Sequence, residues 1–250
     1  MNLKISIIGL GYIGRALAEN LVGQYEVLGT TRDCGKLANL KSVHKIEELT
    51  ASSKPSKELL DSDIIVLNIP PFKGQLEWFK SWDWNFSIRI IFLSSTSVYE
   101  LNKGFVNNDT APLYKSDKAK NLINTENWIK ESFSHHSVLR LGGLLGGERH
   151  PGKILAGKKD LVGGDSPINL VHQMDVVGFI AQLITSKEWL STYNVVFPEH
   201  PSRKSFYQNF AGNLNLELPI FLAGGNDGKI VVDTELEKIY QFQHPISSSI

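Results

Sequence analysis

The stretch KISIIGLGYIGRALAENL, residues 4–21, decides the fold of this chain of 250 residues. Its first part, within Leu3–Ile8, is a short and mostly apolar run of the kind that forms a buried strand of a parallel sheet. Three glycines follow within Gly9–Gly14, and Tyr12–Val22 then carries apolar residues at helical spacing: Ile13, Leu17 and Leu21. The order of strand, glycine turn and helix predicts the first βα unit of an α/β protein.

The glycine turn has the spacing G-x-G-x-x-G, which suits a dinucleotide when the turn connects a strand to a helix. Gly9 allows a tight turn, Gly11 lets a pyrophosphate approach the backbone, and Gly14 lets the helix pack closely on the strand. The free N–H groups and the positive dipole end of the helix then attract phosphate. We therefore expect cofactor contacts at Gly9, Gly11, Tyr12, Ile13 and Gly14. A glycine turn without a ligand, or with an S-adenosyl ligand, is the alternative.

The rest of the chain alternates apolar runs with helical stretches, which indicates a Rossmann-type α/β fold, a doubly wound parallel sheet. Further strands are predicted at Tyr25–Thr30, Asp63–Ile69, Ile88–Leu93, Ser137–Leu141 and Tyr193–Phe197. Helices are predicted at Leu37–Lys41, Thr125–Ser132 and Val176–Thr185. We expect a dinucleotide-binding domain over 1–145 plus 169–197, and a small C-terminal substrate-covering lobe over 146–168 plus 198–250.

Composition excludes several classes of protein. Lys and Arg together number 26, as do Asp and Glu, and this zero net charge argues against a nucleic-acid partner. The single cysteine, Cys34, allows neither an internal disulfide nor a cysteine-based zinc site and fits a reducing cytoplasm. No stretch approaches the roughly 18 apolar residues that a membrane span needs. We expect a cytoplasmic protein with a small-molecule substrate and no metal; its oligomeric state does not follow from the sequence.

The end of the second predicted strand bears on the choice between NAD and NADP. NAD sites often place an acidic residue there to bind the ribose hydroxyls. Here Thr31 and Arg32 come first, and they suit a 2′-phosphate because a guanidinium grips it with paired hydrogen bonds. Asp33 follows one place later. The sequence favours NADP, with NAD possible, and the alternative for Arg32 is a solvated loop residue.

Open α/β sheets bind ligands beyond the carboxyl ends of their strands. Asn68, Ile69 and Pro70 end one predicted strand, and Ser94 and Ser95 end the next. We expect the first three and Ser94 to line the cofactor cleft, although a hydroxyl-rich strand end can also be an ordinary turn.

Several segments in order resemble the extended short-chain dehydrogenase/reductases, also called the NAD-dependent epimerase/dehydratase family. SSTSVYE at 94–100 is similar to the family's SS-x-x-VYG strand end, and TAPL at 110–113 to the stretch before its active-site helix. Further similar pieces are Glu126, LRLGG at 139–143, NLVHQMDVV at 169–177 and NVV at 194–196. The chain departs from the family in its glycine spacing, which is usually G-x-x-G-x-x-G, and in its short length. Both departures resemble a small, atypical branch.

The resemblance implies a Tyr as general acid/base, a Lys four residues later that lowers its pKa, and a Ser that holds the substrate oxygen. Ser95 matches the Ser, and Tyr114 with Lys118 offers the Y-x-x-x-K spacing. Counted back from Glu126, however, the family's Tyr falls near Lys118 and its Lys near Leu122. Either a shortened loop makes Tyr114 and Lys118 the working pair, or the pair is lost and Tyr114 is a loop aromatic.

Two functions follow from the sequence. The first is an NAD(P)-dependent oxidoreductase or epimerase/dehydratase that acts on a small carbonyl compound or a nucleotide-linked sugar. The second is a non-catalytic NADP-binding sensor, which the irregular Y-x-x-x-K position favours. His172 and Asp175 are expected in capping or core roles rather than in catalysis. Arg140, Arg149 and His150 either face a phosphorylated substrate or lie in a solvated loop.

Overall fold

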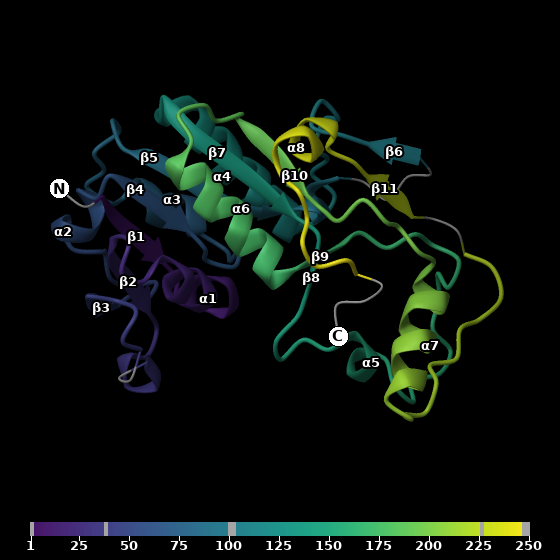
Figure 1. The fold of residues 1–250 in the computed structure, drawn as a ribbon. Helices are drawn as coiled ribbons and strands as arrows, with labels where there is room; N and C mark the ends of the chain where they lie inside the picture. The colour runs from purple at the N-terminus through teal and green to yellow at the C-terminus, as the bar shows by residue number, and fades with distance from the viewer. Residues whose placement is uncertain (1–2, 38–39, 100–103, 226–227, 247–250) are drawn as a thin grey trace. The chain divides into compact units, whose positions relative to one another are not determined.

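A computed structural model describes residues 3–37, 40–99, 104–225 and 228–246, and its centre is a seven-stranded parallel sheet (Figure 1). The strand order is β10-β7-β5-β4-β1-β2-β3, so the direction of winding reverses between β1 and β4. The strands are β1 (Lys4–Ile8), β2 (Glu26–Thr31), β3 (Lys45–Glu48), β4 (Ile64–Leu67), β5 (Arg89–Ser95), β7 (His135–Leu141) and β10 (Thr192–Val195). The predicted Rossmann-type α/β fold is confirmed.

Helices connect and flank the strands. They are α1 (Tyr12–Leu21), α2 (Lys57–Leu60), α3 (Gln75–Lys80), α4 (Asp117–Ser132), α5 (Pro151–Ile154), α6 (Gln173–Thr185), α7 (Arg203–Asn213) and α8 (Thr234–Ile239). Side chains at their starts explain several boundaries, because Ser56, Ser116 and Ser202 each accept a hydrogen bond from an N–H of the first turn. None of the helices in the described ranges is long and apolar enough to cross a membrane.

The chain forms two compact units, each built from several segments. The first comprises 1–98, 113–140 and 177–193, and the second comprises 99–112, 141–176 and 194–250. The second unit contains two small sheets, β6 (Gly104–Val106) with β11 (Lys229–Val231), and β8 (Gly143–Leu145) with β9 (Leu170–His172). The predicted lobe segments 146–168 and 198–250 both fall inside the second unit. This unit also contains 99–112, 141–145, 169–176 and 194–197, which were predicted in the dinucleotide-binding domain, so the predicted division stays a prediction.

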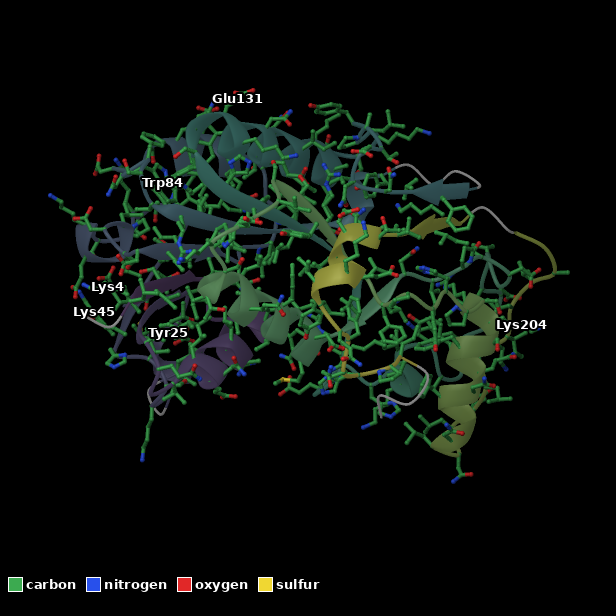
Figure 2. All side chains as sticks on the ribbon, turned by 45° about the horizontal axis from the view of Figure 1, so that its top comes forward. Lys4, Tyr25, Lys45, Trp84, Glu131 and Lys204 are labelled. Carbon is green, nitrogen blue, oxygen red and sulfur yellow. The ribbon has the colours of Figure 1, made fainter. Side chains whose placement is uncertain are left out.

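Aromatic residues pack between α3 and α4 in the first unit. Trp78 and Trp82 meet edge to face at 4.7 Å between ring centroids, and Trp82 stacks on Trp84 at 5.2 Å. Trp84, labelled in Figure 2, also contacts Trp128 and Phe133 of the α4 region. Pairs of this kind contribute roughly 0.5–1.5 kcal/mol each beyond their buried area. Trp82 and Trp84 are therefore core residues, and Trp78 and Trp128 are half-buried beside them.

The structure differs from the sequence predictions at several elements. Strand β3 was not predicted, because its sequence KIEE is mostly charged. The predicted helix Leu37–Lys41 is replaced by a 3₁₀ turn at Cys34–Leu37, with 38–39 outside the described residues. Helix α4 begins at Asp117 rather than Thr125, because Ser116 caps a first half in which exposed polar residues alternate with buried apolar ones.

Candidate functional site

The glycine turn between β1 and α1 is fixed by contacts with two neighbouring strands. Gly9 has φ +107°, a conformation that L side chains rarely adopt, and a Cβ there would collide with the carbonyl oxygen of Asn68. Its N–H donates to Thr30 Oγ1 at 3.0 Å, and its carbonyl accepts from Asn68 Nδ2 at 2.9 Å. The turn is therefore held between the ends of β2 and β4, at the point where the direction of winding of the sheet reverses.

The other two glycines have different surroundings. A Cβ at Gly14 would collide with the carbonyl of Gly9, so this glycine is needed for the packing of α1 on the turn. Gly11 is exposed, and a Cβ there would meet nothing within 4 Å among the described residues. No side chain in the described part of the chain caps α1, whose preceding residue is Gly11. The open side of Gly11 thus fits a phosphate that approaches the backbone and the helix end.

The loop after β2 carries the residues expected at the adenosine end of a cofactor. Arg32 is exposed, whereas Asp33 turns its carboxylate back into its own loop and accepts from the N–H of Gly35 at 3.0 Å. The Thr31 hydroxyl donates to the carbonyl of Asp33 at 3.4 Å and accepts from the N–H of Asp33 at 3.3 Å. Burial, followed by the negative charges of Glu48 and Asp33, raises the pKa of the Cys34 thiol. Glu48 of β3 pairs with Thr31 of β2 and brings to this loop a carboxylate that sequence reasoning missed.

The loop after β4 lies against the glycine turn. Asn68 and Ile69 both approach the place where a Gly9 Cβ would stand, the Ile69 side chain to within 3.4 Å. Pro70 is exposed. Gln75, the first residue of α3, is completely buried and donates from Nε2 to the carbonyls of Ile69 and Pro70. Sequence reasoning did not single out Gln75.

The two serines predicted for the site at the end of β5 have different surroundings. Ser94 is buried and its hydroxyl donates to Glu126 Oε1 at 2.5 Å, so this side chain is engaged in the interior. Glu126 also pairs with Arg140, which is buried in β7. Both interpretations offered for Arg140 were therefore wrong. Ser95 is half-buried, and its hydroxyl accepts from the N–H of Ser97 at 3.1 Å.

Tyr114 and Lys118 do not share a helix face. Tyr114 precedes the capping residue Ser116 and is 48% exposed, whereas Lys118 is exposed in the first turn of α4. The hydroxyl oxygen of Tyr114 accepts from Asn127 Nδ2 at 3.4 Å. Leu122, where the family pattern expects the Lys, is buried. The helical geometry of a Y-x-x-x-K pair is therefore not formed.

In the second unit, Asp175 holds the C-terminal segment. Its carboxylate is completely buried and accepts from the backbone N–H groups of Gln243 and His244 at 2.7 and 3.1 Å. His172 stacks on His244 with 4.5 Å between ring centroids. Burial and then the nearby charge of His244 lower the pKa of His172. Asp175 and His172 therefore make contacts that stabilise the fold.

Residues 4–75 match the family model described as NADP oxidoreductase, coenzyme F420-dependent. The chain is 32% identical over 268 residues to Protein YeeZ of Escherichia coli K12, and the match covers 97% of each chain. A functionally unknown conserved protein from Silicibacter pomeroyi has a similar structure, with TM-score 0.80 and 17% identity over 99% of this chain and 98% of that one. UDP-glucuronic acid 4-epimerase from Bacillus cereus, solved with NAD, gives TM-score 0.73 and 19% identity over 99% and 96%. At these identities the two solved structures show the fold alone.

Proposed function

The chain belongs to the family of Protein YeeZ, within the extended short-chain dehydrogenase/reductases, and from this premise we propose that it is an NADP-dependent oxidoreductase or epimerase. The observation that carries the proposal is the contrast among the three glycines. Side chains at Gly9 and Gly14 would collide with the protein itself, whereas the space beside Gly11 is open. A turn that needed glycine only for its own conformation would not require one at Gly11.

The residues that would hold NADP all lie in the first unit. Gly11, Tyr12 and Ile13 present the start of α1 to the diphosphate, and Arg32 with Thr31 receives the 2′-phosphate. Asp33 supports NADP over NAD because its carboxylate is bound to Gly35 rather than directed at a ribose. When bound, the nicotinamide supplies hydride chemistry to a carbinol or carbonyl carbon.

The chain's own groups would handle the substrate oxygen and the proton. Ser95 would hold the oxygen, Tyr114 would pass the proton through its hydroxyl, and Lys118 would favour the ionised Tyr. Because Tyr114 lies outside the helix that carries Lys118, the loop before α4 would have to move for the two side chains to act as a pair. The substrate class that we propose is a small carbonyl compound or a nucleotide-linked sugar, as the name of the Bacillus cereus epimerase suggests.

A second function, a non-catalytic NADP sensor, is favoured by one observation. The position that the family gives to its Lys is the buried Leu122, and Tyr114 lies outside the helix. Both functions share the dinucleotide site, so cofactor binding and turnover have to be measured separately.

Calorimetric titration of NADPH and NADH tests the shared site. Gly11→Val should fold, because its Cβ meets no neighbour in the described structure, yet weaken NADPH binding by at least about tenfold. Gly212→Val, at another exposed glycine with room for a side chain, is the matched control and should bind NADPH like the wild type. Wild-type protein that binds neither dinucleotide, or a Gly11→Val variant that binds normally, would overturn the proposal.

A further inference from the structure

The loop between β4 and α3 is held by two amide side chains, one at each end. Asn68 Nδ2 reaches the carbonyl of Gly9 at 2.9 Å and so joins the start of the loop to the glycine turn. Gln75 Nε2 reaches the carbonyls of Ile69 and Pro70 at 3.3 and 3.2 Å from the other end. The loop thus forms a wall against Gly9 of the glycine turn.

The sequence of this loop explains why it needs an outside donor. Pro70 and Pro71 have no backbone N–H, so the loop has few donors of its own for its carbonyl oxygens. Gly74, with φ +84°, turns the chain so that Gln75 enters the interior at the start of α3. The orientation of the Gln75 amide follows from its two acceptors, because a flipped amide would place Oε1 against two carbonyl oxygens.

The other half of the same amide has no partner. Gln75 Oε1 is buried and receives no hydrogen bond from residues of the described ranges. A buried acceptor without a donor destabilises the fold, and this cost offsets part of what the two hydrogen bonds to Ile69 and Pro70 contribute. Stability alone therefore does not account for glutamine at this position.

We propose that Gln75 is a positioning residue for the dinucleotide, which turns the Ile69 and Pro70 carbonyls away from the cofactor phosphates. Carbonyl oxygens that pointed out of this wall would repel a diphosphate beside Gly11. With both oxygens bound to a buried amide, the wall presents the Ile69 side chain next to the glycine turn instead. This inference rests on the proposed dinucleotide site.

The test compares cofactor affinity with stability in Gln75→Met, which keeps the length of the side chain and removes both amide groups. The thermal midpoint should change little, because the loss of two hydrogen bonds and the removal of one unpaired buried oxygen offset each other, while the NADPH Kd rises about tenfold. Gln24→Met is the matched control, because Gln24 is exposed and makes one bond to the Asn20 carbonyl at 3.3 Å in the same unit. It should bind NADPH like the wild type.

Gln75→Glu provides a second variant of nearly the same shape. Its carboxylate would face the Ile69 and Pro70 carbonyls without a proton to donate, so its NADPH Kd should rise more than that of Gln75→Met. Equal NADPH affinity in wild type and in whichever Gln75 variant folds would overturn the inference and leave the proposed function intact. Wild-type protein without dinucleotide affinity would instead remove the proposed function itself.

Discussion

The carboxylate of Glu126 and the guanidinium of Arg140 form a buried ion pair, with 2.7 Å between Oε2 and Nη2. Arg140 Nε adds bonds of 3.3 and 3.2 Å to the two carboxylate oxygens, and Ser94 donates to Oε1. Side-chain exposure is 1% for Glu126 and 3% for Arg140. The Glu126 carboxylate therefore joins α4 to β5 and β7. Its partner in β5, Ser94, directly precedes Ser95, which we propose for substrate binding.

Removing one partner of this pair should destabilise the protein more than removing both. Glu126→Gln leaves a buried guanidinium without its counter-charge and should lower the free energy of unfolding by roughly 3–5 kcal/mol. The double variant Glu126→Met with Arg140→Met replaces the pair by apolar groups and should lose less. Urea unfolding measures both changes. A double variant less stable than Glu126→Gln would contradict this account.

Arg32 should determine cofactor preference. Arg32→Ala removes the guanidinium proposed for the 2′-phosphate and should raise the NADPH Kd roughly tenfold or more while leaving the NADH Kd unchanged. Lys54→Ala, which removes an exposed positive charge elsewhere in the first unit, should change neither constant. Calorimetric titration distinguishes the cases. If wild-type protein bound NADH as tightly as NADPH, Arg32 would have no role in specificity.

Turnover by the wild type separates the two proposed functions, and a Tyr114 variant tests the proposed acid. If Tyr114 passes the proton, Tyr114→Phe should lower kcat by roughly 100-fold or more without changing the NADPH Kd. The assay follows NADPH absorbance with small aldehydes, ketones and nucleotide-linked sugars as substrates. Asn127→Ala, which removes only the 3.4 Å contact to the Tyr114 hydroxyl, is the control and should keep most of the turnover. Full turnover in Tyr114→Phe would exclude Tyr114 as the acid.

Much of the sheet could be predicted because its strands are buried on both faces. All four residues of β4, for example, are completely buried and apolar, and this gives a continuous apolar run in the sequence. Strand β3 lies at the edge of the sheet, where charged residues prevent further pairing and no apolar run forms. The glycine turn could be predicted because its three glycines act through local backbone geometry.

The interior polar contacts of the site could not be predicted, because they join residues far apart in the sequence. Nothing local to Ser94 indicates that its hydroxyl turns toward Glu126, 32 residues later, rather than toward a cofactor. The role that we propose for Gln75 depends on a turn that directs the first residue of α3 inward. Spacing alone likewise could not show that Ser116 starts α4 after Tyr114, which separates Tyr114 from Lys118.

Lys229 should make the second unit more stable as pH rises above 8. Lys229 is 7% exposed, and its ammonium donates to the carbonyl of Tyr99 at 2.8 Å. Burial lowers its pKa from 10.5 to about 8. Between these values the unfolded chain binds a proton that the folded chain has lost, so the free energy of unfolding rises with pH across this window. Below it, the buried charge costs on the order of 3 kcal/mol.

Lys229→Met removes this titration, so its stability relative to the wild type should be greatest near pH 7 and should decline as pH approaches 10.5. Urea unfolding at a series of pH values measures the difference. Lys238→Met is the control, because Lys238 is exposed and paired with Glu235 in the same unit, and its difference from the wild type should vary little over this range. Parallel curves for Lys229→Met and the wild type would show that the lysine keeps an ordinary pKa, since only a group that titrates differently in the folded and unfolded states can change the slope.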